Sequence, residues 1–169
     1  MTLQMDISLV KDKTFKIKGK TGFALTDPNG LTLESIDGTS SKVFTSAGEY
    51  EVAGISVVGL KTDEGNIFVY EVDGLRICHL GNITKKLTDN KVSQIGDIDV
   101  LFVPVVSESI ELTQQIESYY VIPFGYKSDD ELDKFLKESG FAVEKVVKFS
   151  IKKDDIVEDQ ITEIKVLVN

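Results

Sequence analysis

The only cysteine and the only histidine of the chain, Cys78 and His79, are adjacent in the segment "GLRICHLGN", residues 74–82. Such a pair can be metal ligands, a thiol nucleophile with its base, or part of an apolar core. A hydrolytic zinc site needs about three protein ligands and a position for water. The apolar run around the pair predicts a β-strand, in which consecutive side chains point to opposite faces. We therefore expect neither joint chelation nor a thiolate–imidazole dyad.

Carboxylates are the other groups that could carry chemistry. Asp27 ends an apolar strand pattern, and Asp63 and Glu64 lie between two further patterns. If they gathered near His79, these acids would form a site suited to Mg²⁺ or Ca²⁺. Each also has a structural interpretation, because Asp27 can cap a turn and "DEG" is typical of a hairpin turn. The acidic run at 127–134 lacks calcium-loop spacing and is typical of a helix amino terminus.

Short strands with period-two alternation predominate in the elements that must position these residues. The clearest hairpin is "NIFVYEVDGLRICHLGN", where Asp73 and Gly74 favour a type I′ turn. The segments "DVLFVPV" and "YYVIPFG" are apolar on both faces and predict buried central strands. The tail, "QITEIKVLVN", alternates and predicts a strand that pairs at a sheet edge.

Three helices complete the predicted α+β fold of about a dozen short strands. "TDNKVSQIG" predicts a short helix capped by Thr88, and "SESIELTQQIES" one capped by Ser107 or Ser109. "SDDELDKFLKESG" predicts the best helix, from an amino-terminal cap at Ser128 to a carboxyl-terminal cap at Gly140.

Length and composition indicate one globular domain over residues 1–169. With 28 acidic against 19 basic residues, the net charge is −9, and no basic stripe points to a nucleic-acid partner. No apolar run reaches the roughly 20 residues that span a bilayer, and the amino-terminal segment does not have the pattern of a signal peptide. One cysteine excludes an internal disulfide. We expect a cytoplasmic protein without a membrane partner.

Read in order, five segments between about residue 5 and residue 150 resemble the metallo-β-lactamase superfamily, particularly its small lactonase-like branch of metal-dependent hydrolases. They are "FALTDPNG", "SAGEYEVAGISVVGL", "NIFVYEVDGLRICHLGN", "IGDIDVLFVPV" and "YYVIPFGYKSDDELDKFL". The resemblance implies an αββα sandwich of two facing β-sheets, here truncated and sheet-rich with few helices.

The chain departs from the family pattern at the positions that hold metal. The family's H-x-H-x-D-H loop is replaced by a shorter segment without histidine. A further family histidine should fall near Lys61, Thr62 and Asp63. The aspartate of H-L-G-D is Asn82, and the histidine of I-P-M-H-Y is Gly125. The resemblance therefore implies no catalytic residue, no metal ligand and no cofactor.

What the resemblance leaves is a vestigial pocket at the old catalytic position, consisting of Asp27, His79, Asn82, Gly125 and Tyr126. His79 can equally be a partly buried side chain with a backbone or hydroxyl partner, and Asn82 a left-handed turn residue after Gly81.

We favour a catalytically silent protein of this fold that acts in binding or assembly, by forming a homo-oligomer through an exposed sheet edge or face. One alternative is a metal-dependent hydrolase with an unorthodox carboxylate-rich site. Another is a small-ligand binder that reuses the pocket without metal, with Tyr126 and Asn82 as polar groups. The protein partner stays unknown.

Overall fold

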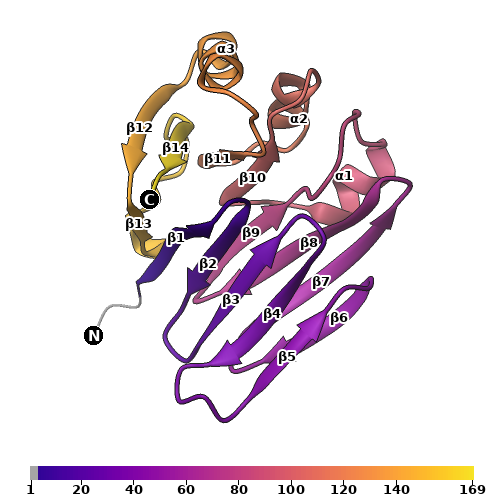
Figure 1. Cartoon of the computed structure of the whole chain (residues 1–169), viewed down its shortest axis with the longest axis vertical. Helices are drawn as coiled ribbons and strands as arrows, with labels where there is room; N and C mark the ends of the chain where they lie inside the picture. Colours follow the sequence, from indigo (N-terminus) through magenta and orange to yellow (C-terminus); the bar gives the residue numbers. More distant parts are fainter. Residues whose placement is uncertain (1–3) are drawn as a thin grey trace.

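A computed structural model describes residues 4–169 and places two β-sheets face to face (Figure 1). In the six-stranded sheet the order is β13-β1-β2-β3-β4-β5, and in the eight-stranded sheet it is β12-β14-β11-β10-β9-β8-β7-β6. The strands of the first sheet are β1 (Met5–Lys11), β2 (Thr14–Lys18), β3 (Gly22–Asp27), β4 (Gly30–Ser35), β5 (Ser41–Phe44) and β13 (Lys148–Ile151). Those of the second are β6 (Gly48–Val52), β7 (Ile55–Thr62), β8 (Gly65–Val72), β9 (Leu75–His79), β10 (Val100–Pro104), β11 (Tyr120–Phe124), β12 (Ala142–Val146) and β14 (Glu163–Leu167). The expected pair of facing sheets is confirmed.

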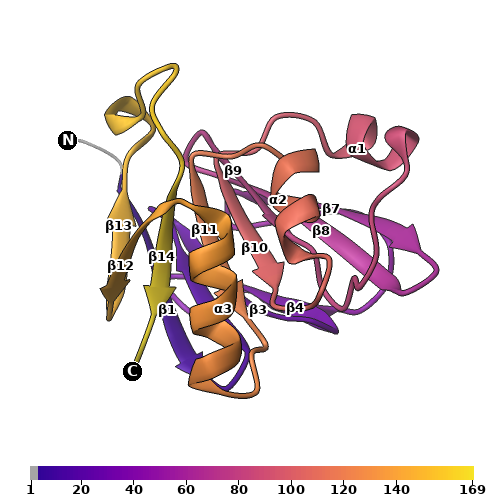
Figure 2. The ribbon, with the colours of Figure 1, turned by 90° about the horizontal axis from the view of Figure 1, so that it is seen from above.

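The α-helices α1 (Asp89–Ile95), α2 (Ser109–Gln115) and α3 (Asp129–Ser139) accompany the eight-stranded sheet (Figure 2). A short 3₁₀ turn, η1 (Lys153–Asp155), precedes β14. No α-helix of the described residues covers the outer face of the six-stranded sheet, so the truncation falls on that side. None of the helices in residues 4–169 is long and apolar enough to cross a membrane.

Three predicted helix caps, Thr88, Ser128 and Gly140, are confirmed, and one is wrong. The hydroxyl of Thr88 accepts from the backbone N–H of Lys91, and that of Ser128 accepts from Glu131. The predicted cap of α2 by Ser107 or Ser109 is wrong, because Glu108 holds the cap position without a side-chain hydrogen bond. The Ser109 hydroxyl instead donates to the carbonyl of Pro104, so it stabilises the end of β10.

Two hydrophobic layers hold the structure together. Between the sheets lie the inward side chains of both, among them Phe15, Tyr70, Phe102 and Phe124. Between the eight-stranded sheet and the helices lies a second layer, which includes Cys78. Strands β10 and β11 contribute to both layers, which confirms the prediction that they are buried and central.

The position of the last strand corrects the sequence analysis. β14 was expected at an edge, but it lies between β11 and β12 and pairs in parallel with both. Ile164 and Val166 face the helix layer, while Leu167 packs between the sheets and Lys165, on the same face, pairs with Glu144 and Glu163. The edge is β12, which is largely exposed. Parallel strands need a long crossover, and residues 147–162, which include β13 and η1, supply it between β12 and β14.

The hairpin between β8 and β9 has the predicted turn. Asp73 has φ 50° and Gly74 has φ 84°, as a type I′ turn requires. The turn fixes a register in which Val69 lies opposite Cys78 and Phe68 opposite His79. This register places His79 at the carboxyl end of β9, where β3 and β11 also end.

Candidate functional site

His79 lies between the sheets with no solvent exposure. Its ring centroid is 4.6 Å from that of Phe124 and 5.3 Å from that of Phe102. Nδ1 accepts a hydrogen bond of 3.0 Å from the backbone N–H of Gly81, and Nε2 has no partner. Burial lowers the pKa of His79 to about 3, because an imidazolium would be desolvated there. The side chain is therefore neutral at pH 7, and one of its two nitrogens is already committed to the fold.

Cys78 points to the other face of β9, as the sequence predicted for neighbouring strand residues. It is fully buried in the layer beneath the helices. Burial raises the pKa of its thiol to about 12, and the nearby guanidinium of Arg76 offsets only part of that effect. A protonated, inaccessible thiol is neither a nucleophile nor a metal ligand. Cys78 and His79 therefore form no catalytic pair.

Asp27 and Asn82 are connected through the turn that follows β3. Oδ1 of Asp27 accepts from the backbone N–H groups of Asn29 at 2.7 Å and Gly30 at 3.1 Å. The amide of Asn82 donates to Oδ1 of Asn29 at 3.0 Å. The left-handed residue here is Gly81, with φ 64°, and not Asn82. A side chain at Gly81 would meet the carbonyl of Asn66 at 2.7 Å, so glycine is needed for close packing.

Gly125 and Tyr126 directly follow Phe124, whose ring packs against that of His79. They line a cavity of about 260 Å³, with Phe15 and Phe124 in its wall. Gly125 has φ 75°, and a Cβ atom there would lie 3.8 Å from Cε of Lys13. Partial burial raises the pKa of Tyr126 above its ordinary value, and Asp129 adds to the shift. The structure thus divides the predicted pocket: Asp27, His79 and Asn82 do not line this cavity.

The carboxylates of the alternative site do not gather either. Glu64 accepts hydrogen bonds from the backbone N–H and the hydroxyl of Thr84, which lower the pKa of Glu64. Across residues 4–169 no three or more His, Cys, Asp and Glu side chains lie together so as to hold a metal ion. The donors present therefore do not fit a zinc centre, which needs about three of them around an open position.

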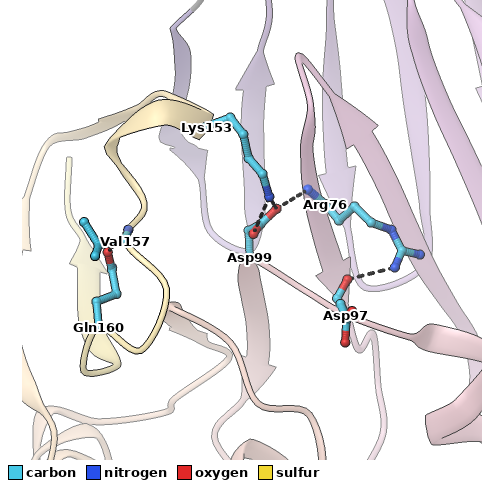
Figure 3. A network of polar contacts seen from close by, with 6 residues as sticks. All are labelled: Arg76, Asp97, Asp99, Lys153, Val157 and Gln160. Carbon is cyan, nitrogen blue, oxygen red and sulfur yellow. Dashed lines mark hydrogen bonds and ion pairs between the residues drawn. The ribbon is translucent and has the colours of Figure 1, made fainter.

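A polar network lies at the amino-terminal end of β10, away from His79 (Figure 3). The sequence analysis did not predict it. Asp99, with a side chain 7 % exposed, accepts from the backbone N–H of Arg76 at 2.8 Å and pairs with Nζ of Lys153 at 3.2 Å. The Arg76 guanidinium donates to the carbonyl of Asp97. A groove of about 700 Å³ adjoins this network. The sequence does show an acid, Asp99, directly before "VLFVPV". Its partner Lys153 lies more than fifty positions later, so the pair could not be predicted from neighbouring residues.

A family model for the beta-lactamase superfamily domain matches residues 25–124. The chain belongs to this superfamily. The matched segment runs from the end of β3 through β11 and so contains Asp27, His79 and Asn82. No curated protein sequence matches the chain.

One solved structure of the superfamily shares the fold. A proposed zinc-dependent hydrolase of the metallo-β-lactamase superfamily from Thermotoga maritima superimposes with a TM-score of 0.77 at 22 % identity, over 96 % of this chain and 98 % of that chain. A proposed metal-dependent hydrolase from Parabacteroides distasonis has a TM-score of 0.47 at 13 % identity, over 95 % and 97 % of the two chains. The diiron β-hydroxylase CmlA from Streptomyces venezuelae has a TM-score of 0.44 at 8 % identity, over 63 % of this chain and 33 % of that chain. The first of these confirms the metallo-β-lactamase-like fold.

Proposed function

We propose that this protein is a catalytically silent member of the beta-lactamase superfamily that acts in binding or assembly. The observation that supports the proposal most is the state of His79. Its imidazole is fully buried between Phe102 and Phe124, and the N–H of Gly81 occupies Nδ1. A metal ligand must offer the ion an available lone pair. In this neutral imidazole the lone pair of Nδ1 accepts from Gly81, and Nε2 carries the proton.

The neighbouring polar groups support the same proposal. The carboxylate of Asp27 holds a turn, and the amide of Asn82 holds the Asn29 side chain. Oδ1 of Asp27 and the amide nitrogen of Asn82 already make protein hydrogen bonds, which would be weakened if these side chains turned toward a cation. Fold alone does not carry an activity, because function depends on the site.

Restoring one family ligand tests the proposal. We expect Asn82→Asp to show no phosphoesterase or lactonase activity above the wild type in Zn²⁺ or Mn²⁺, because the histidine ligands are still missing. The matched control is Asn66→Asp, which introduces the same charge at the start of β8. Hydrolysis by Asn82→Asp that a chelator abolishes, and that Asn66→Asp lacks, would overturn the proposal.

For the assembly role, the proposed contact is a homo-oligomer through β5, the edge strand of the six-stranded sheet. Val43 on this strand is 70 % exposed, and the outer face beside it carries no helix of the described residues. An unpaired edge can add a strand from a second copy. Light scattering should then give twice the chain mass for the wild type and the chain mass for Val43→Lys. Equal masses for both proteins would show that β5 does not form the contact.

A further inference from the structure

A second cavity, of about 260 Å³, lies beside the end of the β7–β8 hairpin, between the segment after β9 and the start of α1. Four lysines line it: Lys61, Lys85, Lys86 and Lys91. They come from two stretches of the chain, residues 61–64 and 83–91, which the fold brings together. We call this feature the lysine cavity.

The gathering of lysines is unusual for a chain with net charge −9. Of the ion pairs formed within residues 4–169, none includes a lysine of this cavity. Nζ of Lys91 donates to the backbone carbonyl of Lys61 at 2.9 Å, which holds its charge at the site. Like charges at one cavity repel, and an anion would remove that cost.

Acids at the wall do not neutralise the four cations. The cavity is also lined by Asp63 and Glu64. Glu64 is oriented by the N–H and hydroxyl of Thr84, and its pKa is lowered, so it contributes one negative charge. Four lysines and two carboxylates line the cavity, and Glu111, outside the lining, also attracts Lys86. The positive charge that remains favours an anion.

Apolar and hydroxyl groups complete the lining. Ile83 is 2 % exposed and Leu87 is 9 % exposed, so both belong to the core behind the cavity. Thr62 and Thr88 also line the cavity; the Thr62 hydroxyl donates to the carbonyl of Gly65, and that of Thr88 accepts from the N–H of Lys91. Ligand sites combine an apolar surface with a few polar groups that fix orientation. The volume is close to the lower end of the range of about 300–1,000 Å³ for such sites.

We propose that the lysine cavity binds a small molecule through a dianionic phosphate group. Lysine ammonium groups act as point charges for phosphate oxygens, and Ile83 and Leu87 offer contact to an organic group attached to it. This inference rests on the proposed binding role and names a class of ligand for it. Binding of the phosphate group by lysines requires no metal ion.

The test is a titration of the ¹⁵N-labelled full chain, followed by amide resonances, with phenyl phosphate and with inorganic phosphate. It is run at constant ionic strength and about pH 8, above the second phosphate pKa of about 6. We expect saturable shifts confined to residues 61–64 and 83–91. The double variant Lys85→Met/Lys86→Met should weaken binding at least about tenfold, because two charge-assisted contacts are lost. Lys137→Met, on the exposed face of α3, is the matched control and should change the affinity less than about twofold.

Two outcomes support the proposal and identify the source of the phosphate. Tighter binding of phenyl phosphate assigns the cavity to phosphorylated organic molecules, and equal binding assigns it to free phosphate. Shifts that do not saturate, or that the double variant leaves unchanged, overturn the proposal while the metal-free role stands. Stoichiometric metal with hydrolysis would instead overturn the proposed function, whatever the titration gives.

Discussion

Acid should destabilise this protein through His79, and the size of the effect follows from its burial. The folded-state pKa is about 3, against about 6.5 in an unfolded chain. Between these values the unfolded chain binds a proton that the folded chain does not. The free energy of unfolding is therefore unaffected by His79 above about pH 6.5 and falls as the pH is lowered toward 3.

The magnitude is large enough to measure. Each pKa unit corresponds to about 1.4 kcal/mol, so the full shift amounts to roughly 5 kcal/mol. At about pH 4.5 the imidazole contributes a loss of roughly 3 kcal/mol relative to pH 7, by the same linkage relation. Carboxylates whose pKa is lowered, such as those of Asp6 and Glu64, add their own acid sensitivity, so a variant without the imidazole is needed.

The assay is urea unfolding of the wild type and of His79→Leu at about pH 7 and pH 4.5. Leucine is apolar, does not titrate, and leaves the carboxylates in place. The wild type should lose roughly 3 kcal/mol more than the variant between the two pH values. An equal loss in both proteins would refute the conclusion that His79 is held neutral in the core.

Further changes test other parts of the account. Gly125→His should lower stability by about 1–2 kcal/mol, because φ 75° is strained for any side chain, without adding tight zinc binding; an unchanged melting temperature would contradict this. Cys78, with its raised pKa of about 12, should resist a thiol reagent at about pH 8 until the chain unfolds, and stoichiometric labelling of the native protein would show otherwise. Asp99→Ala should lower the free energy of unfolding in urea by about 1–3 kcal/mol, since the N–H of Arg76 loses its acceptor. A change near zero would show that the network does not stabilise the fold.

Local patterns predicted much of this fold because they act over a few residues. The turn at Asp73 and Gly74, the caps at Thr88 and Ser128, and the opposite orientations of Cys78 and His79 each depend on neighbours in sequence. Features set by distant partners were missed. The alternation in β14 could not reveal that β11 and β12 would cover both of its edges.

The candidate site shows the same limit. The predicted pocket grouped residues by their motif positions, yet Gly125 and Tyr126 line a cavity from which His79 is absent. The rings of Phe102 and Phe124 pack against His79. The lysine cavity was also missed, because its lysines are spread over thirty positions, from Lys61 to Lys91, and join only in the folded chain.

The most direct test of the central claim is metal content. Protein purified without chelator is offered Zn²⁺, Mn²⁺ and Mg²⁺ in turn, passed through a desalting column, and analysed by mass spectrometry for metal per chain. The account predicts no stoichiometric metal, because the donors in residues 4–169 do not assemble a site. One tightly held ion per chain, together with hydrolysis that a chelator abolishes, would contradict it.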